Sequence, residues 1–122
     1  MPETDRPVLC IDFDGCLHAY TSGWKGADVV SDSPVPGAQE FVRLAQKHFK
    51  VVVFSARSHQ AGGIEAMKRW MARWGFPDGI GFPEGKPPAQ VYLDDGAVRF
   101  EGTWPKPADL LKLKSWVERL KK

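Results

Sequence analysis

The first residues whose types and spacing could do chemistry are two aspartates, Asp12 and Asp14, which are separated by Phe13 and followed by Gly15. Gly15 allows the chain to turn, so both carboxylates can approach one centre. Carboxylates crowded in this way repel each other unless a cation or a proton shares the site. A hard divalent cation with oxygen ligands fits such a site, and Mg²⁺ suits phosphate chemistry. Taken alone, these residues are equally typical of an acidic turn on a solvated loop.

Three further polar groups stand beside apolar runs. Ser55 follows a valine-rich run, so its hydroxyl could reach a phosphoryl oxygen. Lys86 precedes two prolines that stiffen the chain, and a lysine balances carboxylates and phosphate as a compact charge. Asp94 and Asp95 follow another apolar run and could complete the oxygen shell of a metal. In isolation, a turn serine, a surface lysine and an acidic turn explain them as well or better.

The elements that must position these residues are short apolar runs alternating with helical patterns, which is typical of an α/β fold with a mostly parallel sheet. In such sheets the site lies at the carboxyl ends of the strands. The polar groups would therefore meet, although they are far apart in the sequence. The predicted strands are, in chain order, 8–13, 51–54, 79–82, 91–93 and 98–100.

Three helices are expected between and after these strands. The first begins near Pro36, since proline suits the first helical turn. The second follows Gly62 and Gly63 and ends at Gly75, which resembles a C-terminal cap. The third begins around Pro107. Their apolar faces are predicted to be Ala38, Phe41, Val42, Ala45 and Phe49 in the first helix, Ile64, Met67, Met71 and Trp74 in the second, and Leu110, Leu113, Val117 and Leu120 in the third.

Length and composition predict one domain over residues 1–122. Apolar residues make up 43% of the chain, with five Trp and seven Phe, which suffices for a packed core. The apolar runs are too short to span a bilayer, and the first residues lack the apolar segment of a signal peptide. We therefore expect a cytoplasmic protein without a membrane partner. The net charge of +2 is too small to argue for nucleic-acid binding by itself.

The two cysteines, Cys10 and Cys16, do not have the spacing of a zinc site. A disulfide between them is not expected in a reducing compartment. Cys10 is expected to be a buried strand residue. Cys16 is expected to lie beside the acidic pair, where a redox role is the less favoured interpretation.

The order of the polar groups carries more information than each group alone. Asp-x-Asp-Gly after the first strand, serine after the second, lysine before the fourth and Asp-Asp after it together resemble the four motifs of the haloacid dehalogenase-like superfamily, from Ile11 to Asp95. The stretches that begin at Ile11, Ser22, Val51 and Lys86 also look like a group of short, mostly uncharacterised bacterial and phage members. The resemblance implies a Rossmann-like three-layer α/β/α fold around a mostly parallel sheet.

The resemblance also implies an activity, the Mg²⁺-dependent hydrolysis of phosphate monoesters. Asp12 would be the nucleophile and would form an aspartyl-phosphate. Asp14 would protonate the leaving oxygen and then deprotonate the hydrolytic water. Mg²⁺ would be held by Asp12, by the backbone carbonyl of Asp14 and by Asp94 or Asp95, one binding directly and the other supporting it.

The phosphoryl oxygens would be held by Ser55 and Lys86 as negative charge develops. Arg57 follows the serine closely and could grip a second anionic group of the substrate. A similar Ser-x-Arg occurs in phosphatases that trim polynucleotide ends. That likeness is a weak pointer to nucleic acid, because the basic surface expected of such an enzyme is not obvious in the sequence.

Members of this superfamily usually gain specificity from an inserted cap domain, and this chain has no insertion of that size. The irregular segment of about 16–36, here called the flap, would cover the site with His18, Tyr20 and Trp24. Tyr20 and Trp24 could stack on a base or sugar, although packing against the domain is slightly favoured. An uncapped site suits a large phosphorylated substrate, such as a nucleic-acid end, a phosphoprotein or a glycan; alternatively, another subunit covers the site.

Two other classes of protein compete with this interpretation. A receiver domain has similar length and a phosphorylated aspartate, but it carries adjacent acids after the first strand and the phosphoacceptor after the third. Here the spaced pair comes first, the adjacent pair comes last, and Glu84 follows the third predicted strand. A catalytically idle relative would only bind phosphate or a partner. The presence of Asp12, Asp14, Ser55 and Lys86 favours the enzyme.

Overall fold

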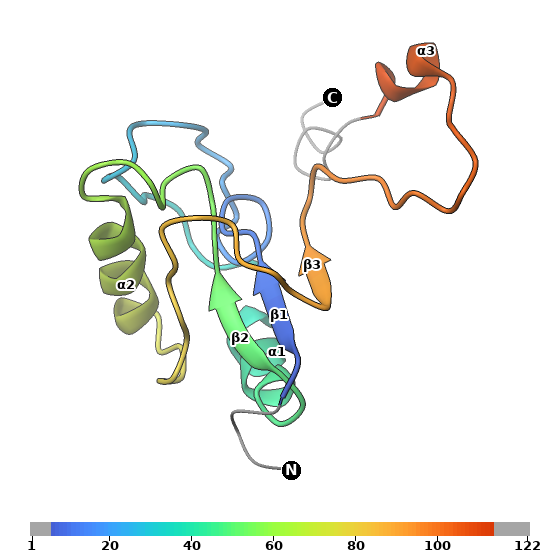
Figure 1. Cartoon of the computed structure of the whole chain (residues 1–122). Coiled ribbons are helices and arrows are strands. Elements are labelled where there is room, and N and C mark those ends of the chain that lie inside the picture. The colour runs from blue at the N-terminus through green and yellow to red at the C-terminus, as the bar shows by residue number, and fades with distance from the viewer. Residues whose placement is uncertain (1–5, 114–122) are drawn as a thin grey trace.

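The computed structural model of the chain describes residues 6–113 and contains a sheet of three parallel strands in the order β2-β1-β3 (Figure 1). The strands are β1 (Val8–Ile11), β2 (Lys50–Val53) and β3 (Val91–Leu93). β1 is central, and its pairing puts the last residues of all three strands side by side. The predicted strands at these three places are confirmed, with β1 and β2 ending slightly earlier than expected.

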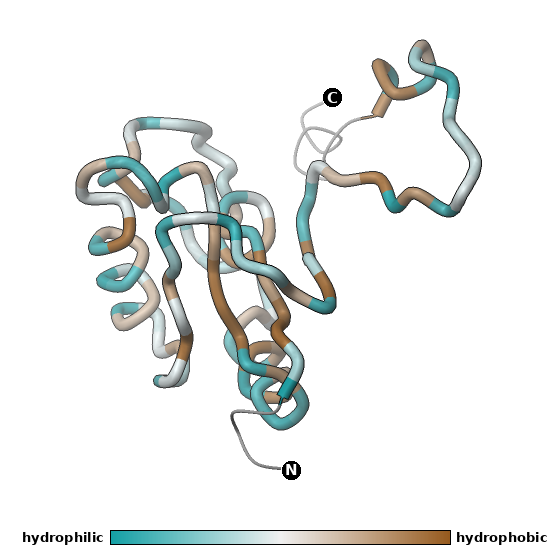
Figure 2. Tube along the Cα trace, in the orientation of Figure 1, coloured by the Kyte–Doolittle hydropathy of each residue, from teal (hydrophilic) through white to brown (hydrophobic). Residues whose placement is uncertain are grey.

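Two helices, α1 (Ala38–Ala45) and α2 (Gly63–Arg73), pack on one face of the sheet. Side chains alternate between the faces of a strand, so every second residue of β1 and β2 points toward these helices. Figure 2 shows the brown, apolar colour running along both strands. The main members of the resulting core are Leu9, Ile11, Val51 and Val53 from the strands, Ala38, Val42 and Ala45 from α1, and Met67, Trp70 and Met71 from α2.

The third helix, α3 (Pro107–Leu110), lies away from the sheet, and none of its residues is buried (Figure 1). Over residues 6–113 the chain thus has the coarse α/β class that the sequence predicts, with helices packed on one face of the sheet. The helix predicted to begin at Pro107 is present, but Leu110 and Leu113 of its predicted apolar face are exposed. Val117 and Leu120 lie outside the described residues. In the described range, no helix combines the length and apolar character needed to cross a bilayer.

Two predicted strands are wrong. The run 79–82 contributes a single bridge, in which Val53 N–H donates to the Gly81 carbonyl at 2.8 Å and Gly81 N–H donates to the Val51 carbonyl at 3.0 Å. Glycine weakens a strand because it offers no side chain to pack. The run 98–100 forms no strand, and its apolar side chains are exposed because the chain there has left the sheet (Figure 1).

In α1 and α2, one residue of each predicted apolar face is exposed. Phe41 is 44% exposed and Trp74 is 37% exposed, whereas the unpredicted Trp70 is only 4% exposed. The Trp70 ring packs edge-on to that of Phe13, with the centroids 5.0 Å apart. Trp74 stands at the C-cap, one turn beyond Trp70, and its ring lies 6.5 Å from the Trp70 ring at the end of the helix.

α2 ends at Arg73, and Gly75 terminates it as the left-handed residue of a C-terminal cap, the role predicted for this glycine. Gly75 has a φ of +75°, which residues with side chains rarely adopt. Its N–H donates to the Ala72 carbonyl at 3.2 Å, and the N–H of Phe76 donates to the Met71 carbonyl at 3.0 Å. These two bonds form a Schellman cap, and the Phe76 ring adds the usual hydrophobic contact by packing on Trp70 at 5.5 Å.

Gly75→Ala is expected to lower the free energy of unfolding by about 1–2 kcal/mol, because a Cβ disfavours the left-handed conformation. The added Cβ would meet no atom within 4 Å, so no clash contributes. Gly85→Ala is the matched control: its Cβ is equally free, and its φ lies outside the left-handed region. Urea denaturation measures both, and equal losses of stability would contradict the role of φ.

Candidate active site

A cavity of about 150 Å³ opens where the three strands end. Asp12 follows β1, Ser55 follows β2 and Asp94 follows β3, and all three line this cavity. Lys86 reaches the same cavity from the loop before β3. The structure therefore brings together four of the residues that the sequence singles out, from four separate segments of the chain.

The chain beyond β1 is tied to the chain beyond β3. The backbone N–H of Asp12 donates to the Leu93 carbonyl at 2.9 Å, which sets Asp12 beside the second acidic pair. Carboxylate oxygens of Asp12 and Asp95 and the Sγ of Cys16 all lie within 4.8 Å of one another. Two carboxylates at this separation fit a divalent cation, and oxygen is the ligand that Mg²⁺ prefers. The thiol is a softer ligand that Mg²⁺ does not need.

Asp12 is crowded by negative charge. Burial raises its pKa to about 8, and the hydrogen bond to Asp95 and the charges of Asp94 and Asp95 act in the same direction. Without a cation, the cluster therefore shares a proton. Burial, followed by the charge of Asp12, also raises the pKa of Cys16 to about 12. A thiol that keeps its proton is a poor nucleophile, which argues against a reactive Cys16.

Gly15 provides the space that Asp95 occupies. Gly15 has a φ of +85°, and a Cβ built on it would overlap the Asp95 carboxylate, with the Asp95 Cγ only 2.7 Å away. Glycine at this position thus allows the turn after the acidic pair and also the close approach of a carboxylate from beyond β3.

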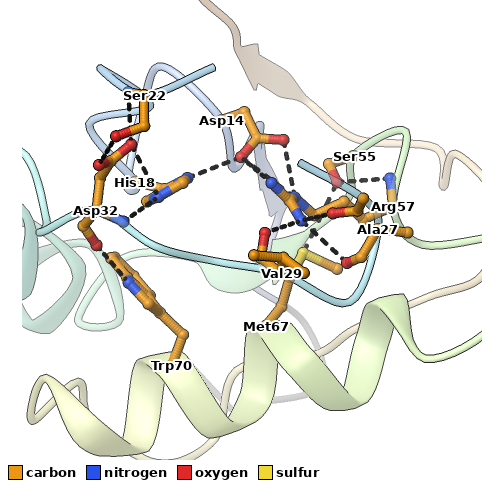
Figure 3. A network of polar contacts seen from close by, with 11 residues as sticks. Asp14, His18, Ser22, Ala27, Val29, Asp32, Ser55, Arg57, Met67 and Trp70 are labelled. Atoms are coloured by element: carbon orange, nitrogen blue, oxygen red, sulfur yellow. Dashed lines mark hydrogen bonds and ion pairs between the residues drawn. The ribbon is translucent and has the colours of Figure 1, made fainter. Parts of the chain in front are cut away.

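Asp14 lies in a different environment, although only Phe13 separates it from Asp12 (Figure 3). Arg57 Nε donates to Asp14 Oδ2 at 2.9 Å, and Arg57 Nη2 donates to Oδ1 at 3.1 Å. His18 Nδ1 lies 2.8 Å from the same Oδ1. The Asp14 carboxylate is turned toward these partners and does not line the cavity.

Arg57 is completely buried and also holds the flap. Its Nη1 lies 2.9 Å from each of the carbonyl oxygens of Gly26, Ala27 and Val29. The Trp24 ring covers the guanidinium, with 4.8 Å between Cζ and the ring centroid. This placement goes against the prediction that Arg57 grips an anionic group of the substrate, because its donors already point at protein oxygens.

Ser55 belongs both to the cavity wall and to a buried turn. Its Oγ accepts the N–H of Arg57 at 2.9 Å and donates toward Met67 Sδ at 3.7 Å. Its own N–H donates to Ser58 Oγ at 3.0 Å. A hydroxyl can rotate its proton from a weak sulfur acceptor to another oxygen while it still accepts from Arg57. The predicted contact of Ser55 with a phosphoryl oxygen is compatible with this turn and stays a prediction.

Lys86 stands at the exposed side of the cavity with Tyr92, a residue that the sequence analysis missed. The Lys86 ammonium lies 4.6 Å from the centroid of the Tyr92 ring, and the Tyr92 hydroxyl donates to the Pro87 carbonyl at 2.6 Å. The aromatic contact orients the ammonium and leaves it accessible. Tyr92 pairs in register with Cys10, and both residues line the cavity. The face of the sheet that the Tyr92 side chain occupies follows from this pairing and not from the sequence pattern.

His18 is only 1% exposed and is not a surface residue of the flap. Its Nε2 accepts the backbone N–H of Asp32 at 3.0 Å. Since Nε2 is an acceptor, Nδ1 carries the proton and donates to Asp14. The indole N–H of Trp70 donates to the Asp32 carbonyl at 2.8 Å and ties this part of the flap to α2. His18 thus has a structural position rather than the predicted contact with substrate, and no spacing in the sequence indicated Asp32.

The flap has no helix or strand between residues 16 and 36, as predicted, and is held by bridges and side chains. Tyr20 adopts a φ of +61° and packs edge-on against the His18 ring at 5.9 Å. Trp24 packs on Arg57 with one face and remains 46% exposed. Both aromatics contact the domain, which the sequence slightly favoured, and Trp24 also offers surface to a ligand.

Phe13 anchors the turn that separates the two aspartates. It is fully buried, and its carbonyl accepts the N–H groups of Cys16, Leu17 and His18 at 3.2, 3.0 and 3.0 Å. Its ring stacks on that of His18, with the centroids 5.4 Å apart. The packing of Phe13 in the core therefore fixes the directions in which the chain presents Asp12 and Asp14.

Without Mg²⁺, the protein is expected to lose stability as the pH rises from about 4 to 8, between the unfolded and the folded pKa of Asp12. The folded pKa of Asp12, about 8, lies above its ordinary value of 3.8, so the folded state binds more protons than the unfolded state in this range. The free energy of unfolding then falls as the pH rises.

Asp12→Asn should flatten this fall because asparagine does not ionise, whereas the exposed Asp78→Asn should leave it unchanged. Urea denaturation at several pH values with a chelator present measures the slope. A wild-type slope in Asp12→Asn would show that Asp12 is not the group responsible.

Comparison with known proteins does not identify a family for this chain. No family model, curated protein or solved structure matches the chain. What the site does is therefore inferred from the placement and chemistry of its own side chains.

Proposed function

We propose that this protein is a Mg²⁺-dependent phosphohydrolase that cleaves phosphate monoesters through an aspartyl-phosphate at Asp12. The observation that carries the proposal is the convergence of Asp12, Ser55, Lys86 and Asp94 on one cavity. A nucleophilic carboxylate, a hydroxyl donor, an ammonium and acids for a cation are the groups that phosphoryl transfer uses. The resemblance of their order to the haloacid dehalogenase-like motifs supports the same function and the three-layer fold.

The reaction would proceed in two steps. In the first, a carboxylate oxygen of Asp12 bonds to phosphorus and the bond from phosphorus to the alcohol oxygen breaks. Asp14, which accepts from Arg57 and His18 in this structure, must first take a proton from solvent, and it gives that proton to the alcohol oxygen. Ser55 and Lys86 offset the charge on the phosphoryl oxygens. In the second, water attacks phosphorus and Asp14 takes its proton. Inorganic phosphate leaves, and the Asp12 carboxylate is restored.

The donor set fits Mg²⁺. Asp12 and Asp95 would hold the ion with the backbone carbonyl of Asp14, and Asp94 would support it from the cavity wall; the proximity of Asp95 to Asp12 favours Asp95 as the direct ligand. When bound, Mg²⁺ supplies positive charge that favours the ionised carboxylate and offsets the phosphate. Asp12 must be ionised to attack. Without a cation its pKa is about 8, so a bound cation is needed to ionise it at neutral pH.

The open side of the cavity suits a substrate that extends beyond its phosphate. Lys86 and Asp94 are exposed, and residues 6–113 contain no cap domain. A nucleic-acid end, a phosphoprotein and a phosphorylated glycan fit this description, as does a site completed by a second subunit. We place this activity in the cytoplasm, as the sequence predicts.

Phosphate release in the presence of Mg²⁺ is the direct test of this function, with nucleotides, sugar phosphates and phosphorylated oligonucleotide ends as substrates. Asp12→Asn is expected to lower the rate by roughly 10³-fold or more because it removes the nucleophile. Asp78→Asn, a matched substitution at an exposed position, should keep the wild-type rate. Phosphate that binds to the wild type while no ester is cleaved would favour an idle phosphate-binding module.

Mg²⁺ is expected to raise the melting temperature of the wild type, and less so in Gly15→Ala, whose Cβ displaces Asp95. The affinity for Mg²⁺ should fall about 10- to 100-fold, as when groups around a metal are disturbed. Gly37→Ala is the control, since its φ of +87° imposes similar strain and its Cβ meets nothing within 4 Å. Equal Mg²⁺ responses in the two variants would contradict a cation beside Asp95.

A further inference from the structure

Arg57 joins the flap to the second aspartate of the acidic pair. One side of its guanidinium donates to Asp14, and the other side donates to the carbonyls of Gly26, Ala27 and Val29 (Figure 3). The three carbonyls belong to a loop without helix or strand, yet all of them lie 2.9 Å from one nitrogen. Their convergence on a single cation is the principal feature of this loop.

A buried cation binds its partners together because none of them can leave without cost. Arg57 is 0% exposed, so water cannot replace a lost acceptor. The guanidinium is also planar, and its donors have fixed directions relative to one another. A shift of residues 26–29 must therefore move the guanidinium, and a shift of the guanidinium must move the Asp14 carboxylate.

His18 provides a second connection between the same two parts. Its Nδ1 is bonded to Asp14, and its Nε2 accepts from the backbone of Asp32, which lies further along the flap. Trp24, stacked on the guanidinium and 46% exposed, gives this assembly an outer surface that a bound molecule could touch.

We propose that Arg57 is a positioning residue that makes residues 26–29 and Asp14 move as one unit, so that displacement of the flap by a bound leaving group carries the acid/base to that group. The role of Asp14 as acid/base rests on the proposed function. The mechanical link between the loop and the carboxylate stands on the contacts of Arg57 alone.

Amide hydrogen exchange tests the link without any substrate. Asp14→Asn removes the charged partner on one side of Arg57, and the amides of residues 24–30 on the other side should then exchange at least about tenfold faster. Arg57→Lys should do the same, because one ammonium cannot replace the planar fork. Arg43→Lys, the same substitution at an exposed arginine of α1, should leave the flap unchanged. Unchanged flap exchange in Asp14→Asn would overturn the link.

The dependence of kcat on the leaving group tests whether Arg57 positions Asp14 for proton transfer. An alkyl phosphate needs a proton on its departing oxygen, whereas an aryl phosphate with an acidic phenol needs it far less. Arg57→Lys should therefore lower kcat for the alkyl ester at least about tenfold more than for the aryl ester. Arg43→Lys should lower neither.

The outcomes separate this proposal from the proposed function. Equal losses for both esters in Arg57→Lys would assign Arg57 a purely structural role and overturn the proposal while hydrolysis stands. A wild type that cleaves neither ester would overturn the phosphohydrolase and the acid/base step. Hydrogen exchange would then still decide whether Arg57 couples the loop to Asp14.

Discussion

β1 pairs in parallel with β2 on one side and with β3 on the other, so three segments far apart in the sequence end at one edge of the sheet. The pairing continues past the strands through the bond from Asp12 N–H to the Leu93 carbonyl. Ile11 and Val53, at the ends of their strands, are fully buried, so the register cannot slip without exposing core side chains. The packing of the strands therefore holds the acidic residues that follow them close together.

The same edge separates two aspartates that are nearly adjacent in the chain. Asp12 is surrounded by acids that favour its protonated form, whereas Asp14 contacts a completely buried guanidinium. Environment rather than residue type distinguishes carboxylates that share a site. A crowded carboxylate suits a bound cation, whereas a carboxylate paired with a buried guanidinium is held in one orientation.

Much of the sheet and of the cavity could be predicted from the sequence, because both follow from local patterns. The apolar runs identified β1, β2 and β3, and the rule that parallel strands end together brought Asp12, Ser55, Lys86 and Asp94 to one place. These residues need only the correct strand and the correct end, which periodicity supplies.

The contacts that the sequence did not predict depend on side chains that cross between loops. Arg57 was expected to face the substrate, but three carbonyls from the flap and one carboxylate attract it inward. Trp70 rather than Trp74 enters the core, where its ring packs against Phe13 and His18 and its indole N–H donates to the flap. Asp32 holds His18 across fourteen positions of irregular chain, a distance at which no periodic pattern operates.

Phe13, the residue between the two aspartates, constrains which sequences the acidic motif can have. In the notation Asp-x-Asp the middle position reads as variable, yet here its ring contacts His18 and Trp70 and its carbonyl receives three backbone N–H groups. A smaller side chain would leave a void between the sheet and the flap, and the aspartates on either side would lose their opposite directions. We therefore expect this position to accept only large apolar side chains of similar shape, although it contributes no chemistry of its own.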